Sequence, residues 1–136
     1  MKKYEVTAAV IRRKGRILLC GRRPDAALAE YFEFPGGKCE PGETLAECLR
    51  REIREELGTE VMVLDELGTN TVELADRTYH LHFLRAVIVP GAPEPSPREG
   101  QSMFWAETAA LDTVRILPGD TAIAHRLAVS EKMKIF

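Results

Sequence analysis

The stretch GKCEPGETLAECLRREIREELGT, from Gly37 to Thr59, carries the strongest structural signal in the chain. Within it, Thr44 and Glu47 stand three residues apart, which is the pattern of a capping box at a helix N-terminus. Gly58 is a typical residue for a helix to end on. We therefore predict a helix over 45–57, along which an apolar residue recurs at every fourth position: Leu45, Leu49, Ile53 and Leu57.

Three glutamates flank this apolar stripe on one side. At ~100° per residue, Glu52, Glu55 and Glu56 fall within an arc of roughly a third of a turn. Carboxylates crowded at the border between core and solvent repel one another and lose hydration. A divalent cation such as Mg²⁺, which prefers oxygen ligands, removes that penalty. The alternative is a set of ordinary surface ion pairs, such as Arg51 with Glu55. The Gly-Gly turn before the helix favours the metal interpretation, because exposed backbone groups would lie beside the same ion.

The fixed positions of this stretch resemble the Nudix box, GX5EX7REUXEEXGU, where U is a bulky aliphatic residue. Every fixed position matches: Gly37, Glu43, Arg51, Glu52, Glu55, Glu56 and Gly58. Ile53 fills the first U, whereas Thr59 departs from the second and weakens a packing position. The resemblance implies an α/β (α+β) fold, the Nudix α/β/α sandwich, with a mixed β-sheet and the box at 37–59 as loop–helix–loop. We expect a single Nudix domain over 1–136.

The resemblance also implies a metal centre. Glu52, Glu55 and Glu56 would ligate Mg²⁺, or Mn²⁺ in its place, with help from the backbone carbonyl of Gly37. Arg51 would hold a neighbouring carboxylate in its ligating rotamer.

Two further glutamates complete the expected site. Glu43 would support the metal ligands from outside. Glu99 matches a metal-proximal glutamate of the MutT branch, although a solvated loop carboxylate is the alternative. Either Glu99 or Glu52 is expected to serve as general base, so that the catalytic set is Glu52, Glu55, Glu99 and Arg51.

The remaining chain alternates apolar segments with turns, which indicates a mixed α and β domain. Before the acidic helix we predict a hairpin of strands over 4–12 and 16–20, an apolar segment at 31–34 and a loop over 35–43. After it we predict strands over 61–67, 71–74, 78–89 and 102–106, with a surface loop over 90–97. A C-terminal helix is expected to begin at Asp120 or Thr121.

Other segments resemble two branches of the family. MKKYEV at the start, the Arg22-Arg23 pair, EFPGGK at 33–38 and REGQ at 98–101 look like the MutT branch. That branch hydrolyses oxidised purine nucleoside triphosphates such as 8-oxo-dGTP to the monophosphate and pyrophosphate. His80-Leu81-His82 and Asp120 look like the CTP pyrophosphohydrolases, which implies CTP or modified pyrimidine triphosphates as the alternative. A non-catalytic nucleotide-binding Nudix module is a third possibility, from a different functional class.

Five residues are candidates for binding the substrate: Arg22, Phe34, Lys38, Arg77 and Asp120. Arg22 would contact a phosphate or the base, and Phe34 would stack on the base. Arg77 would line the base pocket. An ionised Asp120 only accepts hydrogen bonds, which favours a base edge that presents N–H groups.

Each of these candidates has a structural alternative. Arg22 could be a surface arginine at a strand end, Phe34 a core residue, and Arg77 part of a turn with Asp76. His80 and His82 share one face of a strand, where hydrogen-bonded histidines are favoured over a metal pair.

Composition limits the functional classes. The 136 residues are 45% hydrophobic with a formal net charge of -2, typical of a soluble domain and unlike a nucleic-acid polymer binder. Cys20, Cys39 and Cys48 form no CxxC pair, which favours reduced thiols in the cytoplasm. No apolar run is long enough to span a membrane. We expect a cytoplasmic monomer whose partner is a nucleoside triphosphate.

Overall fold

The computed structural model describes residues 2–134. Its strands are β1 (Lys2–Arg13), β2 (Arg16–Gly21), β3 (Phe32–Glu33), β4 (Gly36–Lys38), β5 (Val61–Glu73), β6 (Arg77–Ile88) and β7 (Met103–Glu107). Its helices are α1 (Leu45–Leu57) and α2 (Thr121–Met133), with 3₁₀ turns η1 (Thr108–Thr113) and η2 (Pro118–Asp120).

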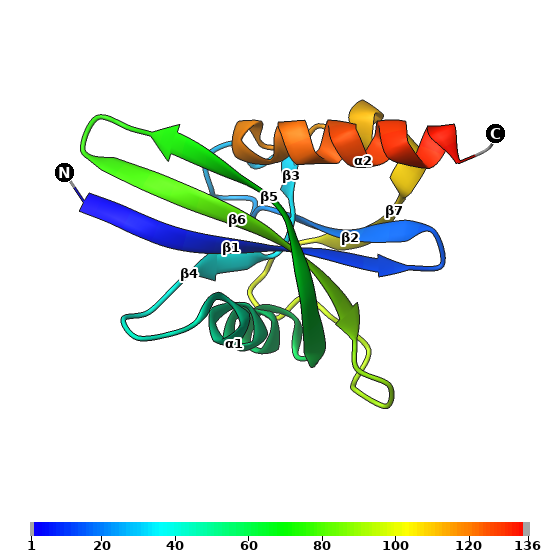
Figure 1. Cartoon of the computed structure of the whole chain (residues 1–136), viewed down its shortest axis with the longest axis horizontal. Helices are drawn as coiled ribbons and strands as arrows, with labels where there is room; N and C mark the ends of the chain where they lie inside the picture. The colour runs from blue at the N-terminus through cyan, green and yellow to red at the C-terminus, as the bar shows by residue number, and fades with distance from the viewer. Residues whose placement is uncertain (1, 135–136) are drawn as a thin grey trace.

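The strands form one mixed sheet in the order β3-β2-β1-β6-β5. β1 runs parallel to β6 and antiparallel to β2 and β4. β7 pairs with β2. Helix α1 covers one face of the sheet and α2 covers the other (Figure 1). The mixed-sheet α/β/α sandwich expected from the sequence is confirmed.

Successive side chains of β1 point to alternate faces of the sheet, which explains why the sheet has a core on each face. Ala8 and Val10 pack with the residues of α2, whereas Ala9 and Ile11 pack with those of α1. Successive strand residues point to opposite faces, so a continuous apolar run supplies both layers. The sheet is thereby held rigidly between two helices, and α1 has a fixed position relative to β1 and β4.

Helix α1 has the predicted bounds and the predicted cap. The Thr44 side chain accepts a hydrogen bond from the Glu47 N–H, and the Glu47 side chain accepts one from the Thr44 N–H. Gly58 ends the helix in the left-handed conformation, at φ 63°. The predicted apolar stripe is buried at Leu49, Ile53 and Leu57. The hydroxyl of buried Thr59 donates to the carbonyl of Pro93, so this departure from the box pattern leaves no unsatisfied polar group.

Two predictions about the strands were wrong. The segment over 35–43 is not wholly a loop, because its first part forms β4 against β1. The separate strands over 61–67 and 71–74 are one strand, β5, which contains register shifts between Val63 and Gly68. The predicted break at 68–70, where a glycine and an asparagine stand, is instead regularly paired with β6. The C-terminal helix begins at Thr121 as predicted.

Among the described residues, 2–134, no helix has the length and apolar character needed to cross a membrane.

We predict that Ile53→Ala lowers the free energy of unfolding by about 2–5 kcal/mol, because it opens a cavity between α1 and the sheet. Ile53 is fully buried. Urea unfolding followed by circular dichroism measures the change. Leu64→Ala serves as control, since Leu64 is 46% exposed and the same truncation there should alter stability by about 0.5 kcal/mol or less. Equal losses in the two variants would contradict the assigned core.

Candidate functional site

The acidic face of α1 meets the Gly-Gly strand β4. Glu56 Oε2 accepts a hydrogen bond from the Gly36 N–H at 3.1 Å. The Glu52 side chain is only 17% exposed, whereas that of Glu55 is 54% exposed and points toward solvent. Glu52 and Glu56 are therefore the inner pair and Glu55 the outer member of the cluster.

Both glycines of β4 are required by this contact. A Cβ at Gly36, which has φ 154°, would lie 2.0 Å from the carbonyl oxygen of Thr7 on β1. A Cβ at Gly37 would lie 2.5 Å from the carboxylate of Glu52. The backbone can approach both β1 and the carboxylates only because no side chain intervenes. The strand thus forms a cradle beside the acids.

Arg51 organises the outer side of the cluster. Its guanidinium donates two hydrogen bonds to Glu43, at 2.7 and 2.9 Å, and one to the backbone carbonyl of Lys38 at 3.0 Å. It also donates to Glu52 at 2.9 Å and to Glu55 at 3.3 Å. The paired guanidinium lowers the pKa of Glu43 to about 2. Arg51 thereby connects the loop before α1 to the carboxylates on the helix.

The inner carboxylates are only partly compensated, since Arg51 pairs with Glu52 whereas no cationic side chain among the described residues forms an ion pair with Glu56. Burial, followed by the charges of Glu52 and Glu99, raises the pKa of Glu56 to about 8. Burial also raises the pKa of Glu52, against the opposing effect of Arg51. Close carboxylates that lose hydration in this way create a strong demand for a cation.

The residues present fit a hard divalent cation. Within 2–134, no three Asp, Glu, His or Cys side chains converge at ligand distance, because Glu52 is turned to Arg51 and Glu56 to Gly36. The donors are nevertheless all oxygen, and the glycine cradle places Gly37 beside the acids, with its carbonyl also in contact with Thr7 Oγ1 at 3.4 Å and Cys48 Sγ at 3.6 Å. This donor set is typical of a magnesium site.

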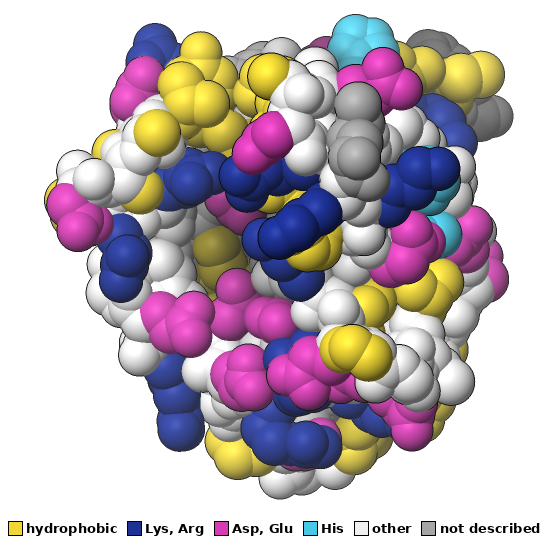
Figure 2. All heavy atoms as spheres, turned by 90° about the vertical axis from the view of Figure 1, so that its left-hand side faces the viewer, with side chains coloured by type: hydrophobic (Ala, Val, Ile, Leu, Met, Phe, Trp, Pro, Cys, Tyr) yellow, Lys and Arg dark blue, Asp and Glu magenta, His cyan; other side chains and the backbone are white. Residues whose placement is uncertain are grey.

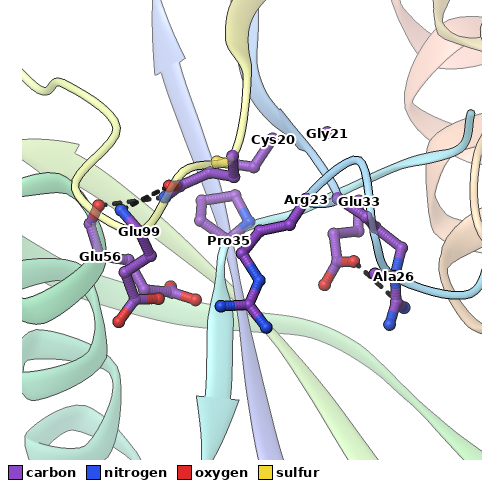
Figure 3. Close-up of a pocket in the computed structure, with 10 residues that line it drawn as sticks. Cys20, Gly21, Arg23, Ala26, Glu33, Pro35, Glu56 and Glu99 are labelled. Carbon is purple, nitrogen blue, oxygen red and sulfur yellow. Dashed lines mark hydrogen bonds and ion pairs between the residues drawn. The ribbon is translucent and has the colours of Figure 1, made fainter. Parts of the chain in front are cut away.

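A cavity of about 660 Å³ opens beside the inner acids. Glu99, from the loop before β7, lies next to Glu56 on its wall, and Glu33 and Arg23 line the opposite side (Figure 3). On the surface, a row of acidic side chains runs below a hollow with Lys and Arg side chains on its rim (Figure 2). Such a rim suits an anionic ligand, whereas the acids beneath it require a cation.

A second cavity, of about 630 Å³, adjoins the first. Its walls are mainly apolar and come from β1, β4, β5, β6 and η2, with Asp120 among the few polar groups. Arg22 and Glu33 line both cavities and form an ion pair at 3.6 Å. The two cavities thus meet at this pair. One elongated ligand could occupy both, with its charged end among the acids and its flat apolar end in the second cavity.

The structure places two of the five candidate binding residues deep in this region. Asp120 is 8% exposed and accepts a hydrogen bond from the Phe34 N–H at 3.0 Å. Burial raises the pKa of Asp120 to about 7. Arg22 stands at the junction of the cavities, and its Nε is buried with no hydrogen-bond partner among the described residues. A buried donor of this kind is available to a ligand.

Two other candidates do not lie as expected. Phe34 is 2% exposed and packs edge-on against Phe83 at 6.1 Å, so it is a core residue at the floor of the cavity rather than an open stacking platform. Arg77 does not line either cavity. It forms a two-bond ion pair with Asp76, as the turn alternative predicted, and reaches the cavity wall only through the Tyr79 hydroxyl at 3.4 Å. In both cases tertiary packing decides the side-chain direction.

Lys38 does line the apolar cavity, with its ammonium 4.5 Å from the ring centre of Tyr4 and 5.5 Å from that of Tyr79. His82 is hydrogen-bonded between Glu5 and Glu66, as favoured from the sequence. His80 is exposed rather than buried, with its side chain 48% accessible.

Sequence reasoning missed Glu33 and Tyr79 as cavity residues. Glu33 belongs to the EFPGGK segment, whose resemblance to the MutT branch was the available clue, and its burial raises its pKa. Tyr79 follows Arg77 at i+2 on β6, which was the available clue. Neither residue type reveals by itself that it faces a cavity.

Comparison with known proteins identifies the family. The model of the NUDIX domain matches residues 1–127. The chain belongs to the Nudix family. It is 36% identical over 120 residues to the CTP pyrophosphohydrolase of Escherichia coli K12, with 88% of this chain and 87% of that protein covered. It is 35% identical over 127 residues to the 8-oxo-dGTP diphosphatase of Haemophilus influenzae, with 93% and 92% covered.

Solved structures of Nudix proteins share the fold. The solution structure of the Escherichia coli ORF135 protein matches with a TM-score of 0.82 and 33% identity, covering 96% of this chain and 92% of that one. The MutT protein of Methanosarcina mazei Go1 has the same fold, with a TM-score of 0.81 at 22% identity over 96% of each chain. The resemblance to both Nudix branches is therefore confirmed.

We predict that Gly37→Ala weakens Mn²⁺ binding about tenfold or more, because the new Cβ displaces the Glu52 carboxylate. The carboxylate is the end of a flexible side chain, so thermal stability should change little. Calorimetric titration with Mn²⁺ and thermal unfolding measure the two effects. Gly15→Ala is the control: a Cβ there meets nothing within 4 Å, although φ is 76°. It should lower stability and leave Mn²⁺ affinity unchanged. Unaltered Mn²⁺ affinity in Gly37→Ala would contradict the cradle.

We predict that Asp120 makes the protein less stable as pH rises from about 4 to 7. The pKa of Asp120 is raised from 3.8 to about 7 in the folded chain, so in this range the folded state holds a proton that the unfolded state has lost. Its contribution is complete below pH 3.8 and is lost as pH passes 7. Asp120→Asn should reduce this fall in the free energy of unfolding between pH 4 and 7 by an amount on the order of a few kcal/mol. Urea unfolding at several pH values measures it.

The matched control is Asp76→Asn. Asp76 is exposed and its pKa is lowered by Arg77, so its substitution should leave the slope between pH 4 and 7 intact. A wild-type slope in Asp120→Asn would show that Asp120 is not the titrating group.

Proposed function

We propose that the protein is a Mg²⁺-dependent nucleoside triphosphate pyrophosphohydrolase, which releases a nucleoside monophosphate and pyrophosphate. The observation that carries this proposal is the pair of adjoining cavities, one acidic and one apolar, which meet at Arg22 and Glu33. A nucleoside triphosphate has a matching division between its phosphate chain and its base. The two family relatives named above act on such compounds by name.

The acids of α1 and Glu99 would hold the cation. We assign Glu52, Glu56 and the Gly37 carbonyl as inner ligands, with Glu99 beside Glu56 and Glu55 on the outer side. Mg²⁺ is preferred and Mn²⁺ can replace it. When bound, the cation supplies the positive charge that the phosphate chain requires and acidifies water. Arg51, fixed by Glu43, keeps Glu52 oriented.

The reaction would be hydrolysis at the β-phosphorus. A carboxylate, Glu52 or Glu99, accepts a proton from water while the water oxygen bonds to the β-phosphorus. The bond between the β-phosphorus and the oxygen that bridges it to the α-phosphorus breaks. That oxygen leaves with the nucleoside monophosphate. Burial raises the pKa of Glu52, which makes its carboxylate a stronger base than a free one. Arg22, with its unpartnered Nε, would contact the phosphate or base at the junction.

We propose an oxidised purine triphosphate, such as 8-oxo-dGTP, as the main substrate. The second cavity has apolar walls that can hold a flat base and one deep polar group, Asp120. With a pKa of about 7, this carboxyl can accept hydrogen bonds from the N–H groups of a purine edge, and donate one when protonated. Similar amounts of identity to a CTP pyrophosphohydrolase and an 8-oxo-dGTP diphosphatase make CTP and modified pyrimidine triphosphates the second candidate.

The non-catalytic alternative has little support, because every acid of the box is present and grouped around the cradle. We further propose that residues 1–136 act as one domain, as a monomer, in the cytoplasm. In support of a reducing compartment, all three cysteines are free thiols.

We predict that the protein releases pyrophosphate from nucleoside triphosphates only with Mg²⁺ or Mn²⁺, and that Glu56→Gln lowers kcat/KM at least about 100-fold. One carboxylate oxygen of Glu56 accepts the hydrogen bond from the Gly36 N–H in the cradle. The glutamine amide of the variant removes the negative charge and keeps the size of the side chain. A screen over ordinary and oxidised nucleotides, ranked by kcat/KM, measures this and identifies the base.

Glu60→Gln is the matched control, because Glu60 is partly exposed, lines neither cavity and pairs with Arg54. Its activity should equal that of wild type. Full activity in EDTA would contradict the proposal. Tight nucleotide binding without any product would support the non-catalytic alternative. An optimum for CTP rather than 8-oxo-dGTP would select the second candidate.

A further inference from the structure

The loop before β7 is docked on the C-terminal end of α1. The Ser96 N–H donates to the Leu57 carbonyl and the Arg98 N–H donates to the Glu56 carbonyl, each at 3.0 Å. The last carbonyls of a helix have no partners inside the helix, so this loop satisfies two of them. The segment that carries Glu99 is therefore attached to the helix that carries the inner acids.

One side chain in this loop connects the two acids directly. Gln101 Nε2 donates to the Glu56 carbonyl at 3.1 Å, and Gln101 Oε1 accepts from the Glu99 N–H at 2.8 Å. Figure 3 shows both interactions as dashed lines beside the labelled Glu56 and Glu99. The Gln101 amide thus forms a bridge between the backbones of two residues whose carboxylates share a cavity wall.

The bridge needs a primary amide. It requires one donor and one acceptor at the end of a side chain of this length, which glutamine provides. A carboxylate would place a second oxygen against the Glu56 carbonyl, and a methionine would provide no donor. The Ser96 and Arg98 hydrogen bonds attach the loop before Glu99, whereas the backbone N–H of Glu99 itself is held by Gln101. Residues 96–100 are all exposed and Gly100 has φ 77°.

We propose that Gln101 is a positioning residue that keeps Glu99 beside Glu56 on the wall of the acidic cavity. This inference rests on the proposed function only in that it takes these acids as the cation site. Gln101 itself would touch neither the cation nor the reacting atoms. Its effect on cation binding would pass through Glu99, in the way that partners of metal ligands usually act.

A double-mutant cycle tests this path of action. The variants are Gln101→Met, Glu99→Gln and the two combined, and the measurement is Mn²⁺ affinity of the full-length, nucleotide-free protein by calorimetric titration, with thermal unfolding alongside. Gln101→Met should weaken Mn²⁺ binding about 10- to 100-fold in the wild-type background. In the Glu99→Gln background it should have almost no further effect.

Two additional variants keep the test interpretable. Gln101→Leu is similar in size, has neither donor nor acceptor, adds no charge to the cavity, and should also weaken Mn²⁺ binding; it replaces Gln101→Met if that variant fails to fold. Ser96→Ala is the loop control, because the backbone N–H of Ser96 makes its hydrogen bond to the helix. Its Mn²⁺ affinity should equal that of wild type.

Several results would overturn the inference. Equal weakening by Gln101→Met with and without Glu99 would mean that Gln101 acts on the cation by another route. A lower unfolding temperature with unchanged Mn²⁺ affinity would reduce Gln101 to a structural role. Failure of the proposed function looks different: wild-type protein would bind Mn²⁺ and release no pyrophosphate, while the cycle could still be measured.

Discussion

The contact between a two-glycine strand and the carboxylates of one helix is the constraint around which the rest of the molecule is arranged. Gly36 donates its N–H to Glu56, and the Cα of Gly37 leaves room for the Glu52 carboxylate. This approach is possible only because β4 is paired with β1 while α1 packs on the same strand from one side. Core packing at Leu49 and Ile53 thereby sets the position of the acids to within the width of a side chain.

The charges in this contact explain why the supporting residues are where they are. Burying like charges together is unfavourable, and the raised pKa of Glu56 reflects it. Arg51 offsets part of the cost on the outer side, and Glu43 fixes its guanidinium with two hydrogen bonds. On the inner side no cationic side chain forms an ion pair with Glu56 among the described residues, which is the basis for the proposed cation at this place. Stability and function are in tension at this point of the fold.

The two joined cavities differ in chemistry from one end to the other, acidic beside α1 and apolar beside η2. Strand β2 and the segment after it bring Arg22 to the place where the acidic cavity meets the apolar one, and β3 brings Glu33 to the same place. The apolar part depends on η2, which carries Asp120 into the cavity wall beside Phe34. Elements from both halves of the chain therefore meet around one elongated space.

The sequence by itself determined the features that depend on neighbours along the chain. Helix α1, its Thr44 cap, its Gly58 end and the shared face of its glutamates all follow from spacing and local hydrogen bonding, as does the start of α2. The tertiary structure decided the pairing of β4, the continuity of β5 across its bulges, the burial of Phe34, and the turn of Arg77 toward Asp76. It also decided that Glu33 joins two cavities and that Gln101 bridges Glu99 and Glu56. These features join residues that are distant in sequence or depend on side-chain direction, and packing around a side chain leaves no local pattern from which to read that direction.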